Sequence, residues 1–254
     1  MKSILKPKLL PMLVGLLGIL ACFLRGSLYA FFTDARNLLP RMHPVGLGLW
    51  GLTALTAALV VLTVRRLSGS ERYADNFSIS LPAALGNVLM ASGILLTVLL
   101  YAPGMPGLVG RLWKLLGIAA APLLFYAGFS RAMGKKPFFL SYVVVSVFIA
   151  FHLVCHYRTW CSDPQLQNYV FAFLGSLGLM LFAYYQAAVC VGVGKRRMLL
   201  GVGLMTAYLC LAALPNADYF YLYLSGAVWA LTGLCNMEGV LSRDEKAGDH
   251  YDSP

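Results

Sequence analysis

Charged residues are scarce in this sequence. Only 12% of its 254 residues are Asp, Glu, Lys or Arg, whereas 59% are hydrophobic. Soluble domains usually carry about 25% charged residues, so this scarcity argues against a soluble globular protein. The mean hydropathy of +0.74 points the same way, and we expect an integral membrane protein.

Acidic residues are half as numerous as basic ones, 10 against 20, and none lies inside a long apolar run. Carriers that are coupled to protons or sodium commonly use an intramembrane Asp or Glu. This chain would need another coupling group, such as a histidine, or no coupling. Its net charge of +10 comes largely from short basic turns, which are typical of orientation signals and not of a nucleic-acid-binding groove.

Several catalytic and metal-binding motifs are also missing. The chain has no GxSxG nucleophile elbow and no P-loop, and its six cysteines form no CxxC pair. His152 and His156 have the spacing of an HExxH motif, but Leu153 stands where a glutamate would supply the general base. The sequence therefore argues against an enzyme, although a metal-dependent membrane enzyme stays open.

Long apolar runs separated by short turns make up most of the chain. A membrane-spanning helix needs about 20 apolar residues, and the continuous apolarity favours helices over barrel strands, which would alternate. We predict an all-α integral membrane protein, a bundle of about eight transmembrane helices. The spans are expected near residues 9–32, 44–64, 79–101, 113–133, 138–160, 168–194, 198–214 and 218–237.

Lysine and arginine are unevenly divided between alternate turns. Of the 20, 14 lie at the N-terminus, in every second turn and in the C-terminal tail, whereas 5 lie in the other turns. Positive residues accumulate in cytoplasmic loops, so we predict a cell-membrane protein with both termini in the cytoplasm (N-in/C-in). The transmembrane domain would cover residues 1–237, and residues 238–254 would form a polar, disordered cytoplasmic tail.

Arg25 lies inside the first predicted span. A charge at that depth is costly unless it is paired or reaches the interface, so it marks a candidate functional site. The open explanations are that Arg25 extends to the outer interface, pairs with Asp34, Asp163 or Asp218, or binds a lipid phosphate or an anionic ligand.

Residues 152–169 form the most polar segment between two spans, HLVCHYRTWCSDPQLQNY. The orientation predicts that this segment faces away from the cytoplasm, at a depth close to that of Arg25. We expect it to contribute to an outward-facing polar pocket. The candidate ligand-binding residues are Arg25, His152, His156, Arg158, Asp163, Gln167 and Asp218.

A metal ion is the alternative for the histidines. His152 and His156 are four residues apart and share a helix face with Cys155 beside them, and imidazole and thiolate are zinc ligands. A buried hydrogen-bonded pair and a pH-responsive pair remain the other two interpretations. For Tyr157, Trp160, Tyr169 and the tyrosines at 219, 221 and 223, we expect the aromatic belt at the membrane interface.

Asn87, Tyr184, Tyr185 and Gln186 form a second polar set, in the inner half of the predicted bundle. We expect both amides to connect helices through hydrogen bonds. The DPQLQNY turn at 163–169 and the YYQAAV segment at 184–189 resemble those of a group of uncharacterised small multi-pass membrane proteins. That resemblance implies no activity.

Three functions remain open from the sequence. The first is a transporter-like or solute-binding protein that takes a small solute or an anionic ligand in the outward pocket. The second is a non-catalytic membrane subunit, sensor or scaffold that recruits partner membrane proteins. The third is the metal-dependent enzyme. In each case the lipid bilayer is the surrounding partner, and nucleic acid is not expected.

Overall fold

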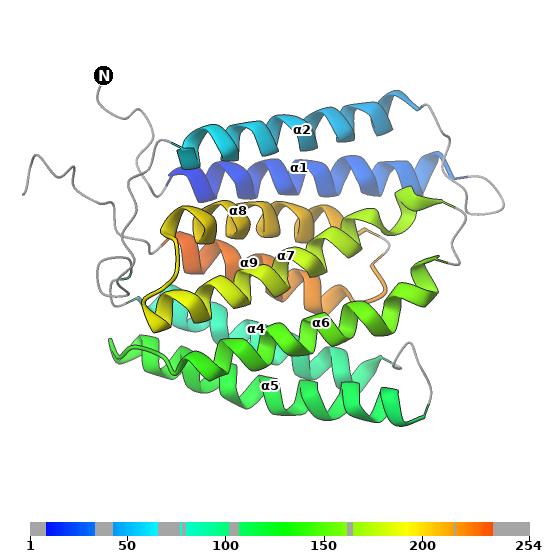
Figure 1. Cartoon of the computed structure of the whole chain (residues 1–254). Helices are drawn as coiled ribbons and strands as arrows, with labels where there is room; N and C mark the ends of the chain where they lie inside the picture. Colours follow the sequence, from blue (N-terminus) through cyan, green and yellow to red (C-terminus); the bar gives the residue numbers. More distant parts are fainter. Residues whose placement is uncertain are drawn as a thin grey trace, which may run out of the picture.

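The computed structural model is a bundle of α-helices (Figure 1). It describes residues 9–33, 43–65, 77, 80–101, 107–161, 165–215 and 217–235, without the side chains of 158, 159, 166 and 167. The predicted tail at 238–254 lies outside the described residues.

All eight predicted spans correspond to helices in the described part of the chain. They are α1 (Leu9–Phe31), α2 (Pro44–Arg65), α4 (Leu81–Leu100), α5 (Leu108–Ala132), α6 (Phe139–Cys161), α7 (Leu166–Val191), α8 (Arg196–Ala213) and α9 (Phe220–Cys235). Seven of these are long and apolar enough to cross a membrane, and α9 is a shorter apolar helix of 16 residues. The all-α multi-pass class is therefore confirmed.

The helix boundaries follow local chemistry that the apolar runs do not reveal. α4 begins with Ser80 as its N-cap and a proline in its first turn, where the missing N–H has no consequence. α5 begins at Leu108, five residues before the predicted start at 113, so Arg111 lies inside the helix and not in the turn before it. α7 ends at Gly192, which adopts a left-handed conformation with φ 89°.

The helices pack in a defined order. α4 contacts both α5 and α9, α7 contacts both α6 and α8, and α1 packs on α8. α2 packs mainly on α1 and α8, at the edge of the bundle (Figure 1). α8 and α9 therefore lie in the interior, which agrees with the many buried residues along α8.

Two glycines allow the close approach of α4 to α9. A Cβ at Gly86 would overlap the Thr232 hydroxyl, and a Cβ at Gly93 would overlap the Ser225 hydroxyl. The same Cβ at Gly93 would stand 2.9 Å from the Tyr221 carbonyl oxygen. Small residues at such contacts let membrane helices gain packing that larger side chains would prevent.

The two ends of the bundle carry different residues. We call one the Leu9 end, where α1 begins and α9 ends, and the opposite one the Ala213 end, where α8 ends and α9 begins (Figure 1). The polar segment singled out in the sequence lies at the Ala213 end, because α6 ends there and α7 begins there.

Candidate functional site

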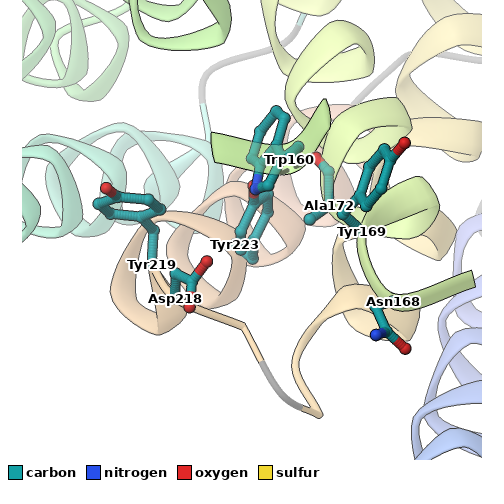
Figure 2. A pocket seen from close by; sticks show the side chains of 7 residues that line it. All are labelled: Trp160, Asn168, Tyr169, Ala172, Asp218, Tyr219 and Tyr223. Carbon is teal, nitrogen blue, oxygen red and sulfur yellow. Dashed lines mark hydrogen bonds between the residues drawn. The ribbon is translucent and has the colours of Figure 1, made fainter. Parts of the chain in front are cut away.

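A cavity of about 130 Å³ lies at the Ala213 end, between the end of α6, the start of α7 and the start of α9. Figure 2 shows the side chains around it. The lining residues are one carboxylate, one amide, four aromatic side chains and one alanine: Asp218, Asn168, Trp160, Tyr169, Tyr219, Tyr223 and Ala172.

Helix periodicity brings the lining residues together. Asn168 and Ala172 are four residues apart on α7, and Tyr219 and Tyr223 are four apart at the start of α9. Residues with this spacing share one helix face. Trp160, in the last turn of α6, faces α7, where its ring is parallel to that of Tyr169 at a centroid distance of 6.5 Å and an interplanar angle of 2°.

Tyr223 is fixed within the wall of the cavity. Its hydroxyl donates to the Ala172 carbonyl oxygen at 3.1 Å and is hydrogen-bonded to the Ser176 hydroxyl at 3.0 Å. Because the ring is fully buried and its hydroxyl is already bonded, it offers the cavity an aromatic surface in one orientation. The site is thus partly pre-organised.

A chain of hydrogen bonds joins the histidines to the cavity wall. His156 Nδ1 bonds to the His152 carbonyl oxygen at 2.7 Å, so Nδ1 carries the proton of the neutral ring. His156 Nε2 is then an acceptor, and the Tyr219 hydroxyl donates to it. His156 therefore orients Tyr219, which lines the cavity.

His152 lies one turn deeper in the bundle than His156. Its Nδ1 accepts a hydrogen bond from the Trp113 indole N–H at 3.3 Å, so its own proton is on Nε2. The His152 and Tyr219 rings meet edge to face at 4.7 Å. The buried hydrogen-bonded pair proposed for these histidines is the interpretation that this geometry favours.

Tyr219 stands in the turn just before α9 and is 6% exposed. Burial raises the pKa of its phenol well above the ordinary value, and the neighbouring charge of Asp218 adds to this effect. Tyr219 is therefore the neutral phenol at physiological pH, which suits its role as the donor to His156.

Arg25 is 2% exposed and lies within the bundle, beside the end of α8. Its Nη1 donates to the carbonyl oxygens of Ala212 at 2.9 Å and Ala213 at 3.2 Å, the last residues of α8. Its Nη2 donates to the Asn168 carbonyl oxygen at 2.6 Å. A cation at a helix C-terminus satisfies free carbonyl groups and complements the helix dipole.

The structure brings only some of the predicted ligand-binding residues to the cavity. Asp218 lines it, whereas Arg25 and His156 stand behind the lining residues Asn168 and Tyr219. Asp163 and the side chains of Arg158 and Gln167 lie outside the described residues.

The metal interpretation finds no support in the described residues. No group of three or more His, Cys, Asp and Glu side chains there could hold a metal ion. Both ring nitrogens of His156 are already engaged in hydrogen bonds. Cys155 is buried, but it does not form a group of this kind with the two histidines.

The aromatic-belt prediction is wrong for three of its residues. Trp160 is 5% exposed, Tyr219 is 6% exposed and Tyr223 is fully buried, so all three face the interior. Tyr157 and Tyr221 are exposed on the bundle surface, as a belt requires. The spacing of Tyr219 and Tyr223 by four residues, with Tyr221 between them, is the signal that separates the two groups.

The sequence GLGLWG at 46–51 matches the GxGxxG spacing of dinucleotide-binding turns. All six residues lie within α2, which begins at Pro44. The dinucleotide motif requires a turn between a strand and a helix, so the spacing carries no nucleotide site here.

Comparisons of the chain with protein-family models, with curated proteins and with solved structures found no match.

Proposed function

We propose that this chain is a transporter-like, solute-binding membrane protein whose cavity at the Ala213 end accepts a small organic cation. The observation that carries this proposal is the composition of the cavity wall. Among the described residues that line it, Asp218 is the charged one, and four aromatic side chains border the same space.

The charge of the ligand follows from the chemistry of this wall. Aromatic faces carry negative electrostatic potential and attract cations, most strongly when the cation is removed from water. A carboxylate adds a full negative charge. Arg25 is close by, but its charge is directed at the carbonyl oxygens of α8 and of Asn168. The wall thus favours an ammonium ion over an anion.

The size of the cavity limits the ligand. A cavity of about 150 Å³ accommodates benzene, and the one at the Ala213 end measures about 130 Å³. This volume suits a ligand about as large as the tetramethylammonium ion, or the ammonium group of a larger amine. Drug-sized ligands need roughly 300 Å³ or more.

The division of basic residues supports an outward-facing cavity in the cell membrane. The charge pattern predicts the Leu9 end in the cytoplasm, which would leave the Ala213 end on the opposite side. The described helices agree with this prediction, because the start of α1 and the end of α9 lie at the same end of the bundle (Figure 1).

A binding measurement on the full chain in detergent tests the proposal. We expect tetramethylammonium to bind, and Asp218→Asn to weaken it by about tenfold or more, since each 1.4 kcal/mol corresponds to tenfold in Kd. Trp160→Leu should also weaken binding by removing one aromatic face. Trp50→Leu is the matched control, because Trp50 is an exposed α2 residue outside the cavity. Equal affinities across all four proteins would refute the proposed site.

The scaffold hypothesis leads to a different expectation. It requires a packed bundle and a stable partner, and it needs no ligand cavity. The cavity with its single carboxylate favours solute binding over a purely structural role. Recovery of a stoichiometric partner protein, together with no detectable cation binding, would favour the scaffold instead.

A further inference from the structure

Arg131 is a buried cation with no counter-charge close to it among the residues that the structure describes. It lies in the last turn of α5 at the Leu9 end and is 5% exposed. Neither Nη1 nor Nη2 has a hydrogen-bond partner among the described residues. The one described acidic residue is Asp218, which lies near the opposite end of the bundle. Gly233 of α9 is next to Arg131, and Asp218 is about 22 Å from Gly233 along the helix axis, at 1.5 Å per residue. A buried charge of this kind is costly unless something neutralises it.

Arg25 provides an internal comparison. Both arginines are almost completely buried, but Arg25 has protein acceptors for both of its terminal nitrogens. For Arg131 the described contact is with the Phe77 ring, which lies 4.4 Å from the guanidinium carbon. An aromatic face attracts a cation only weakly compared with an anion. The donors on Nη1 and Nη2 of Arg131 therefore have no acceptor among the described residues.

A second unpaired polar side chain stands next to Arg131. Gln186 on α7 is 1% exposed, and within the described part of the chain neither its Oε1 nor its Nε2 has a hydrogen-bond partner. The amide was expected to connect helices, as Asn87 does by accepting from the Trp229 indole at 3.0 Å. Buried amides are normally hydrogen-bonded, so Gln186 is an exception that needs a physical explanation.

Gly233 on α9 leaves space between these two groups. A Cβ at this glycine would stand 3.6 Å from Gln186 Nε2, 3.9 Å from Arg131 Nη1 and 3.5 Å from the Phe182 ring. These are ordinary contact distances, so a methyl-sized volume between the three side chains is unfilled. Donors from α5 and α7 therefore converge on one small space that the glycine keeps open.

We infer that Arg131 and Gln186 form an oxyanion-binding site at the Leu9 end, with Gly233 providing the space for a ligand oxygen. The guanidinium group presents paired N–H donors that match phosphate and carboxylate oxygens. Gln186 Nε2 adds a donor, and its Oε1 accepts from a hydroxyl of the ligand. A phosphate that carries a P–OH or a neighbouring hydroxyl satisfies all of these groups.

Two sources can supply this chemistry. A phospholipid headgroup reaches the site from the membrane interface, and a free phosphate reaches it from solution. Charge patterning predicts the Leu9 end in the cytoplasm, where the leaflet surface is negatively charged. The site is independent of the cation cavity at the Ala213 end, and either proposal can fail alone.

The test is thermal denaturation of the delipidated full chain in detergent. One arm adds inorganic phosphate, against sodium chloride of equal ionic strength. The other arm adds phosphatidylglycerol, against phosphatidylcholine. We expect at least one of the two anionic probes to raise the Tm of the wild-type protein. Stabilisation by phosphate identifies a free anion as ligand, and stabilisation by phosphatidylglycerol alone identifies a headgroup.

Two variants and one control connect the effect to the site. Arg131→Gln should abolish the stabilisation and raise the Tm of the ligand-free protein, because it removes an uncompensated buried charge. Gly233→Ala keeps both polar groups but fills the space, so it should weaken binding by about tenfold, which is 1.4 kcal/mol. Arg65→Gln is the control, since Arg65 is exposed in the last turn of α2.

Two outcomes would overturn the inference. One is that neither anionic probe stabilises the wild-type protein beyond its matched control. The other is that Arg131→Gln and Gly233→Ala retain the same stabilisation as Arg65→Gln. If Arg131→Gln does not fold, Gly233→Ala decides the result, because a methyl group fits there at ordinary contact distances.

Discussion

Arg25 can lie buried within this bundle because backbone carbonyl groups accept hydrogen bonds from its guanidinium group. Arg25 serves as a C-terminal cap for α8, with hydrogen bonds to the carbonyl oxygens of Ala212 and Ala213. It also joins α1 to the start of α7 through the Asn168 carbonyl oxygen. Its charge therefore stabilises the packing of α1, α7 and α8 beside the cavity, although Arg25 is not among the residues that line the cavity.

Replacing Arg25 by Leu should destabilise the protein by roughly 2–4 kcal/mol, because buried carbonyl groups lose charge-assisted hydrogen bonds. The Tm of the variant in detergent measures this loss. Arg65→Leu, at an exposed position of α2, should leave the Tm nearly unchanged. Equal effects of the two substitutions would show that the cap contributes nothing to stability.

The raised pKa of Tyr219 predicts a pH dependence at alkaline pH. A phenol whose pKa is higher in the folded than in the unfolded state stabilises the fold fully below the unfolded value of about 10. That contribution is lost as the pH rises from there through the folded pKa. Wild-type stability should therefore fall more steeply above about pH 10 than that of Tyr219→Phe. Parallel pH profiles would contradict the assignment.

For the helices α4 and α9, the sequence predicted that both exist but not which faces pack together. The apolar runs predicted both helices, but a run of apolar residues does not say which face meets a neighbour. Gly86 and Gly93 mark the contact face of α4, and their function is visible only when Thr232 and Ser225 of α9 lie opposite them. Composition therefore predicted the helices, and small residues decided how they pack.

Gly93→Ala should lower the Tm, because its methyl group would stand 2.9 Å from the Tyr221 carbonyl oxygen, which cannot rotate away. Overpacking of this kind typically costs about 1–3 kcal/mol. Gly48→Ala is a matched control on α2, since a Cβ there meets nothing within 4 Å. An unchanged Tm for Gly93→Ala would mean that the two helices can separate without loss.

The candidate site was only partly predictable. The polar segment at 152–169 lies at the end of the bundle that carries the cavity, and Asp218, one of the candidate residues, lines that cavity. Trp160 and Tyr223 were missed, because an aromatic residue near a span end looks the same whether it faces lipid or a cavity. Arg25 was recognised as costly, but backbone acceptors such as Ala212 leave no trace in a sequence.

At the scale of the whole molecule, the orientation in the membrane remains a prediction that a native cysteine can test. Cys161 is exposed at the end of α6, whereas Cys155, Cys190 and Cys210 are buried. A membrane-impermeant maleimide added to intact cells should label the protein, and Cys161→Ser should lose the label. Labelling that appears only after permeabilisation would place the Ala213 end in the cytoplasm.

The whole bundle is consistent with a solute-binding protein that has two polar regions at opposite ends. The cavity at the Ala213 end combines the Asp218 carboxylate with aromatic faces, and Arg131 and Gln186 at the Leu9 end carry donors that have no partner among the described residues. The two proposed sites favour opposite charges, so each would take a ligand of its own. The central claim concerns the cavity and the sign of the charge that it accepts.

Three small ligands that share a branched group of methyls test that claim directly. They are tetramethylammonium, which is a cation, tert-butanol, which is neutral, and pivalate, which is an anion. Titration of each into the purified full chain should give the highest affinity for tetramethylammonium and the lowest for pivalate, with the difference largely lost in Asp218→Asn. Equal affinities for the three ligands, or a preference for pivalate, would contradict the account.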